Sequence, residues 1–157
     1  MNDSAAESPA RNAGRILLGA FMCVAGIGHL TFARAEFQAQ VPPWFPLSPD
    51  LTVLASGVVE IALGAAMILA TRRRALVGLL LAAFFVAVFP GNIAQWMHHR
   101  DAFGLDSDRA RLIRLFFQPV LIAWALWSTG AWRSTGTWRS TGAWRSTRSR
   151  RQSASDR

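Results

Sequence analysis

Four long apolar blocks that carry almost no charge constrain the fold of this chain more than any other feature. A bilayer has a hydrocarbon core about 30 Å thick, which roughly 20 helical residues can cross. A soluble helix bundle would need a polar face on each helix, and these blocks have almost none. The sequence therefore predicts an all-α integral membrane protein, a four-helix bundle. The blocks are Ile16–Phe32, Leu51–Ala70, Ala75–Met97 and Leu112–Ser128.

The domain organisation follows from these blocks. The chain has 157 residues, 52% of them hydrophobic, which suits one modest membrane domain. We expect a short N-terminal segment, a membrane domain and a separate tail. These parts are predicted at 1–13, 14–128 and 129–157, with spans at about 14–33, 51–70, 75–97 and 111–128.

Basic residues, all of them Arg, are distributed unevenly around the predicted spans. Arg11 and Arg15 precede the first span, Arg72–Arg74 join the second to the third, and seven Arg follow the fourth. The other two loops are close to neutral. Because cytoplasmic segments of membrane proteins carry the excess of basic residues, we predict that both termini are cytoplasmic.

The first block has an alternative interpretation as a secretory signal. Arg11 and Arg15 precede it, and residues 33–35 loosely fit a small-residue cleavage site. We favour a retained span, because its polar residues match those of the other spans. A cleaved signal would leave the other three spans in the same orientation.

Polar side chains in all four spans are predicted to lie in the outer half of the bundle. A shared polar cavity that opens towards the outer face explains this placement. The residues are His29, Glu60, Asn92, Gln95 and Gln118, and they are the candidates for ligand binding or a proton relay.

Glu60 is the most informative member of this set. An ionised carboxylate near the membrane midplane is costly, so it is normally paired, protonated or in contact with water. His29 is the candidate partner, and Asn92 or Gln95 could donate a hydrogen bond to Glu60. The alternative is a protonated Glu60 that only holds helices together.

Glycines accompany this acid. Gly57 and Gly64 lie on either side of Glu60, while Gly19, Gly26 and Gly28 are spaced along the first span. Small residues at such spacing let helix backbones approach closely in lipid. We expect a compact bundle rather than a wide pore.

Pro90, Gly91 and Asn92 interrupt the third span. Proline frees the carbonyl four residues earlier in a helix, here that of Val86. We interpret the break as an intramembrane bend, with Asn92 facing Glu60. Asn92 or a polar group of a neighbouring span should donate to the freed carbonyl.

Cysteine and histidine usage argues against two kinds of chemistry. Cys23 is the single cysteine, which excludes an intramolecular disulfide and a CxxC redox pair. His98 and His99 lie at the interface beyond the third span. Because adjacent histidines point apart on a helix, we predict no metal site.

Two segments outside the spans leave alternatives open. Residues 38–50 contain four of the seven prolines, so they form either a stiff external connector or a lid over the outer mouth. The tail repeats STGAWR, STGTWR and STGAWR from Ser128 to Arg145. We predict a disordered extension that touches the anionic inner leaflet incidentally. Nucleic-acid binding is not expected, since nothing else in the chain supports it.

Several motifs, in this order and spacing, resemble those of the DoxX family of small four-helix bacterial membrane proteins. The resemblance covers about residues 14–128 and fails over the tail. It implies a redox-associated component of the bacterial inner membrane, and it assigns no established catalytic residue here. The motifs are GIGHLTF (26–32), VPPWFP (41–46), SGVVEIALGAAMIL (56–69), the Arg turn at 72–74, VFPGNIAQW (88–96) and RLFFQPVLIAWALW (114–127).

The leading functional hypothesis is a non-catalytic or quinone-contacting membrane subunit of a redox complex. Its expected partners are the lipid bilayer and a soluble oxidoreductase subunit. The sequence demonstrates no cofactor, although the polar cavity would suit a quinone head group. Two alternatives stay open, a small proton-coupled transporter that uses Glu60 and a purely structural membrane partner.

Overall fold

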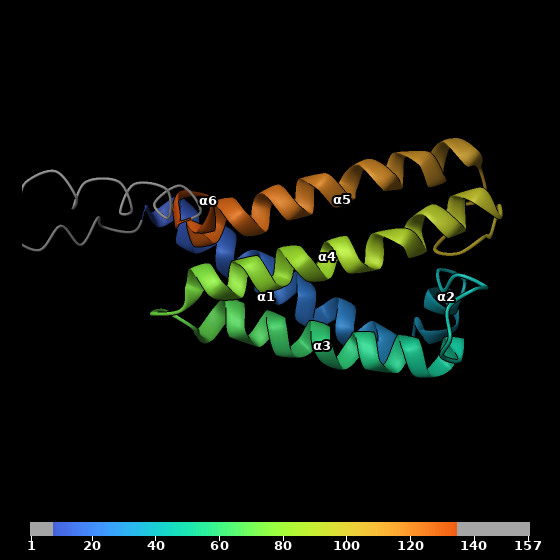
Figure 1. The fold of residues 1–157 in the computed structure, drawn as a ribbon, viewed down its shortest axis with the longest axis horizontal. Coiled ribbons are helices and arrows are strands. Elements are labelled where there is room, and N and C mark those ends of the chain that lie inside the picture. The colour runs from blue at the N-terminus through green and yellow to red at the C-terminus, as the bar shows by residue number, and fades with distance from the viewer. Residues whose placement is uncertain (1–7, 135–157) are drawn as a thin grey trace, which may run out of the picture.

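The computed structural model describes residues 8–134, and this part of the chain is built from helices without a β-strand (Figure 1). Four of the helices are long and apolar enough to cross a membrane. The predicted all-α class is confirmed, and these four helices are those of a multi-pass membrane protein. The helices are α1 (Pro9–Leu30), α2 (Arg34–Gln38), α3 (Pro49–Leu69), α4 (Arg74–Met97), α5 (Asp108–Thr129) and α6 (Ala131–Ser134).

Helix ends differ from the predicted spans by a few residues, and local signals explain the differences. The Ser107 hydroxyl accepts a hydrogen bond from the Ala110 N–H at 3.3 Å, so α5 begins at Asp108 rather than at 111. Gly130, with φ 73°, ends the same helix in the left-handed conformation. The first span ends at Leu30, where a turn leads into α2. The sequence predicts a disordered tail from residue 129, whereas α5 ends at Thr129 and Ala131–Ser134 form the short helix α6. The repeats beyond Ser134 lie outside the described residues.

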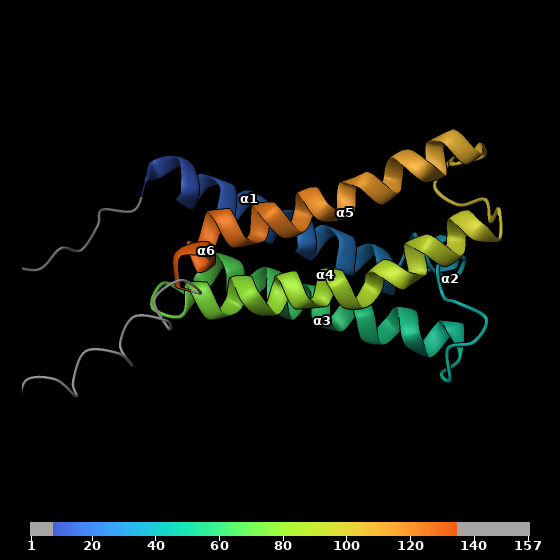
Figure 2. The ribbon, with the colours of Figure 1, turned by 45° about the horizontal axis from the view of Figure 1, so that its top comes forward.

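The long helices form two antiparallel pairs, α1 with α3 and α4 with α5 (Figures 1 and 2). In the first pair, Gly19 faces Gly64 and Gly26 faces Gly57. A Cβ placed at Gly19 would lie 2.7 Å from the Gly64 carbonyl, and one at Gly26 would lie 2.6 Å from the Gly57 carbonyl. The two backbones therefore touch at both places, as the glycine pattern predicts.

One end of the bundle, here named the basic end, is where α1 begins, α3 meets α4 and α5 finishes (Figure 2). Arg15 is 4% exposed there and donates to the carbonyls of Ile68 at 3.1 Å and Ala70 at 3.4 Å. These contacts satisfy carbonyls that the end of α3 leaves without helical partners. A tightly packed core fills the bundle from this end towards its middle. Its buried residues are Leu18, Met22, Met67, Val77, Leu81, Phe85 and Ala125.

At the opposite end, the loop end, α2 and residues 39–48 fold back onto the helices (Figure 1). Arg34 Nε donates to Asp50 Oδ1 at 2.6 Å, which ties α2 to the start of α3. Hydrogen bonding to this carboxylate raises the pKa of Arg34 above its ordinary value. Arg100, just beyond α4, donates to the Val41 carbonyl at 3.0 Å. Of the two interpretations of this loop, the structure favours the lid.

Candidate functional site

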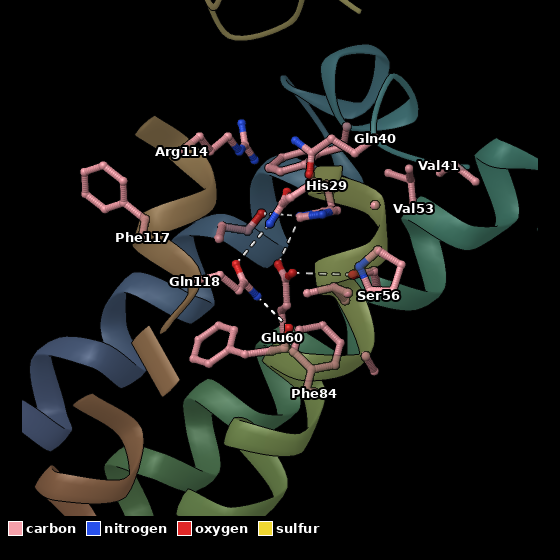
Figure 3. Close-up of a pocket in the computed structure, with 18 of the residues that line it drawn as sticks. His29, Gln40, Val41, Val53, Ser56, Glu60, Phe84, Arg114, Phe117 and Gln118 are labelled. Atoms are coloured by element: carbon pink, nitrogen blue, oxygen red, sulfur yellow. Dashed lines mark hydrogen bonds and ion pairs between the residues drawn. The ribbon is translucent and has the colours of Figure 1, made fainter. Parts of the chain in front are cut away.

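A pocket of about 930 Å³ lies at the loop end and is lined by all four long helices, by α2 and by both loops (Figure 3). Its walls are mainly aromatic and aliphatic. The proline-rich loop contributes Gln40, Val41, Pro42, Trp44 and Phe45 to the lining, so it covers part of the pocket. The aromatic rings of the wall include those of Phe21, Phe37, Trp44, Phe84, Phe103 and Phe117.

A buried His–Glu pair from α1 and α3 lies in the pocket wall. His29 and Glu60 are 6% and 7% exposed, and His29 Nδ1 lies 3.0 Å from Glu60 Oε2. Ser56, one turn earlier in α3, lies with its hydroxyl 3.4 Å from Glu60 Oε1 and donates to it. The structure thus places His29 beside Glu60, as the sequence predicts.

The direction of the His29 contact is as informative as its length. Nδ1 is also 2.9 Å from the carbonyl of Ala25, one turn earlier in α1. Glu60 Oε2 is buried and has no aligned hydrogen bond from a described residue. The imidazole N–H is therefore directed at the Ala25 carbonyl, and its 3.0 Å approach to Oε2 is a lateral contact.

Asn92 and Gln118 form a second polar pair, which joins α4 to α5. Asn92 Nδ2 donates to Gln118 Oε1 at 3.0 Å, and Gln118 Nε2 donates to the Phe85 carbonyl at 2.6 Å. The prediction that Asn92 donates to Glu60 is therefore wrong. The amide pair still lines the same pocket as the His–Glu pair.

Pro90 lies inside α4, which continues through it to Met97. The prediction is that a polar side chain donates to the Val86 carbonyl. Among the described residues, the contact that forms is one residue away, where Gln118 donates to the carbonyl of Phe85. Val86 is 58% exposed, whereas Phe85 is 4% exposed and belongs to the buried core together with Ala125 of α5. A side chain of a neighbouring helix therefore reaches the carbonyl of Phe85 more readily than the carbonyl of Val86.

Gln95 does not join the cluster. It is 1% exposed, and its Nε2 donates to the Arg100 carbonyl at 3.3 Å, beyond the end of α4. Gln95 lies about one helical turn closer to the C-terminal end of α4 than Asn92 does. Carbonyls near a helix C-terminus lack helical partners and need other donors. The expectation that it could donate to Glu60 is wrong.

Two polar residues of the pocket were missed by the sequence analysis. Gln40 Nε2 is buried without a hydrogen-bond partner in the described part of the chain, and nothing in the proline-rich loop signals its role. The Arg114 guanidinium lies 4.9 Å from the centroid of the Phe103 ring, a cation–π contact. Arg114 lies one helical turn before Gln118 on α5, and this spacing could have indicated that both side chains lie on the same face of the helix.

Aromatic stacking links α2 to the His–Glu pair. The rings of His29 and Phe37 are stacked, with centroids 3.4 Å apart and planes 16° apart. Phe37 also meets Phe103 edge to face at 4.6 Å. One face of the imidazole is therefore covered by α2, which fixes the ring in the pocket wall.

Within residues 8–134, no group of three or more His, Cys, Asp or Glu side chains is arranged to hold a metal ion. His99 Nδ1 lies 2.6 Å from Asp108 Oδ1, and both side chains are well exposed. This pair belongs to the surface of the loop end and contributes nothing to the pocket lining.

Comparison with known proteins gives one match. A family model described as a domain of unknown function, DUF8561, matches residues 18–129. This range extends from α1 to the end of α5 and includes His29, Glu60, Asn92 and Gln118. No curated protein and no solved structure matches the chain.

Proposed function

The chain belongs to the DUF8561 family, and we propose that it binds a quinone-class ligand in its pocket as the membrane subunit of a redox complex. The observation that carries this proposal is the pocket itself. It combines a wall of aromatic and aliphatic side chains with a small set of buried polar groups. Small-molecule sites in proteins have this composition and volumes of roughly 300–1,000 Å³.

A quinone head group suits both parts of this lining. Its flat, apolar ring stacks on aromatic side chains, and its carbonyl oxygens accept hydrogen bonds. Gln40 Nε2 is a buried donor without a partner in the described part of the chain. The Arg114 guanidinium also lines the pocket, and it supplies several donors for a carbonyl oxygen.

The surface of the bundle next to the pocket supports entry from lipid rather than from water. Phe21 on α1 and Phe117 on α5 both line the pocket, and they are 55% and 61% exposed. On a membrane-spanning helix such exposed aromatic faces contact lipid tails. A ligand dissolved in the bilayer would therefore meet the pocket between these two helices, which pack against each other.

Packing below the pocket favours binding over transport. Met22 and Phe85 line the pocket floor. Leu18 and Leu81, one turn nearer the basic end, are 0% exposed. These four side chains belong to one apolar core, which separates the His–Glu pair from the basic end.

The remaining parts of the proposal rest on the sequence. The arginines at the basic end support a cytoplasmic position for that end, and in that orientation the pocket would lie towards the outer side of a bacterial inner membrane. The resemblance of several motifs to those of the DoxX family supports association with a soluble oxidoreductase. Copurification of such a partner from native membranes is the expected result. A protein that is always isolated alone, and whose deletion affects neither quinone reduction nor thiol stress, would remove this role.

Quinone binding is tested by filling the pocket. Ala25 lines it, whereas the adjacent Val24 is 61% exposed on the lipid side. Ala25→Phe should weaken binding of a decyl-substituted benzoquinone at least tenfold, because the new ring occupies the site. Val24→Phe is the matched control and should bind like the wild type. Calorimetry on the purified full chain in nanodiscs measures both affinities. Absence of binding to the wild type, or equal affinities in the two variants, would contradict the proposed site.

A further inference from the structure

His29 has one ring nitrogen with defined partners and one without. Nδ1 faces two oxygens, the Ala25 carbonyl at 2.9 Å and Glu60 Oε2 at 3.0 Å. Nε2 forms no hydrogen bond with any residue between 8 and 134, although the side chain lines the pocket. Nε2 is therefore the nitrogen that a bound ligand can reach.

The Ala25 carbonyl decides which nitrogen carries the proton. A carbonyl oxygen is only an acceptor, so a lone pair on Nδ1 at 2.9 Å would be repelled by it. An N–H at Nδ1 is instead attracted to both oxygens. In the neutral imidazole this leaves the lone pair on Nε2, which is then an acceptor.

The geometry around Glu60 supports a neutral ring. An imidazolium would form a short, aligned, charge-assisted bond to a carboxylate, yet Oε2 has no aligned donor among the described residues. A neutral Glu60 carries its proton on Oε2, and its Oε1 still accepts the hydrogen bond from the Ser56 hydroxyl at 3.4 Å. Both side chains are then uncharged, which avoids the cost of burying an ion pair in an apolar wall.

We propose that His29 Nε2 selects the reduced, hydroxyl-bearing form of the ligand, a hydroquinone, over the oxidised quinone. This inference rests on the proposed function and deepens it. A hydroquinone hydroxyl donates to the Nε2 lone pair, whereas a quinone carbonyl would place its own lone pairs against it. Phe37 covers one face of the imidazole, so the ring cannot easily turn to offer Nδ1 instead.

Three ligands on the wild-type chain give the first test. They are a decyl-substituted hydroquinone, its dimethyl ether and the corresponding quinone, measured by anaerobic calorimetry in nanodiscs. The hydroquinone should bind about tenfold more tightly than either of the others, because one buried hydrogen bond is gained. Equal affinities would overturn the inference and leave quinone binding intact. Failure of all three to bind would overturn the proposed function as well.

A double variant gives the second test. His29→Phe with Glu60→Met removes both polar partners, so neither is left unpaired, and the new ring can still stack on Phe37. The quinone affinity should change less than twofold, and the hydroquinone should lose its tenfold advantage. Thr71→Val is the control, since it removes an exposed hydroxyl in the turn between α3 and α4, outside the pocket lining, and should keep the preference. A double variant that still prefers hydroquinone would contradict the role of Nε2.

The protonation of His29 can be observed directly. In a His98→Gln, His99→Gln background, His29 is the remaining histidine of the chain. Nitrogen-15 NMR of the labelled protein should show a protonated Nδ1 and an unprotonated Nε2. A ring protonated at Nε2 would overturn the inference, whatever the binding measurements show.

Discussion

At the scale of single residues, the buried polar groups of the loop end fall into two sets with different consequences. Asn92 and Gln118 satisfy each other and the Phe85 carbonyl, so they hold α4 and α5 together. His29 and Glu60 leave an oxygen without an aligned hydrogen bond and a ring nitrogen without a partner in the described part of the chain. The first set is therefore structural, and the second is the one positioned for a ligand.

Gln118→Leu should destabilise the protein more than Asn92→Leu. It leaves Asn92 Nδ2 without its acceptor and also removes the Gln118 donor to the Phe85 carbonyl, at about 2 kcal/mol or more in total. Asn92→Leu leaves only Gln118 Oε1 unpaired. Phe116→Leu is the control, because Phe116 is 68% exposed on the same helix. Unfolding in sodium dodecyl sulfate, followed by tryptophan fluorescence, measures the order, and equal losses for all three would contradict this assignment.

At the scale of helices, the α1–α3 pair depends on direct backbone contact. A Cβ at Gly64 would lie 2.7 Å from the Gly19 carbonyl and 2.9 Å from the Cys23 backbone nitrogen. Neither backbone atom can move aside as a flexible side chain would. Lipid offers no hydrophobic drive for helix association, so such close packing contributes much of the stability of the pair.

Gly64→Ala should therefore destabilise the bundle by about 1–3 kcal/mol, because the added methyl forces the helices apart. Ala62→Val adds more volume to the exposed side of the same helix and should have little effect. Melting temperatures of the two purified variants give the comparison. A Gly64→Ala protein as stable as the wild type would show that α1 and α3 can separate at no cost.

At the scale of the whole molecule, packing and charge are polarised along the bundle. The basic end is closed by a dense core and by Arg15 on the last carbonyls of α3. The loop end contains the pocket, beneath α2 and the proline-rich segment. The ligand site proposed for this protein therefore lies in one half of the bundle, and the packed core lies in the other.

The proposed orientation predicts which end is accessible from outside the cell. In a Cys23→Ser background, Asp106→Cys at the loop end should react with a membrane-impermeant maleimide in intact cells. Thr71→Cys, in the turn between α3 and α4, should react only after lysis. Both positions are exposed, so a difference in labelling reports the side of the membrane. Labelling of Thr71→Cys alone in intact cells would reverse the orientation.

The sequence by itself determined the four long helices, the glycine contacts and the pairing of His29 with Glu60. Each of these features is compatible with few structures. Long apolar blocks must cross the bilayer as helices, small residues at helical spacing allow close helix packing, and a buried acid needs a polar partner. Only the tertiary structure decided that Asn92 pairs with Gln118, that Gln95 serves the end of α4, and that Gln40 and Arg114 enter the pocket. The rotation of each helix about its axis and the path of a proline-rich loop depend on packing between distant segments. Those contacts have no signature in the local pattern of residues.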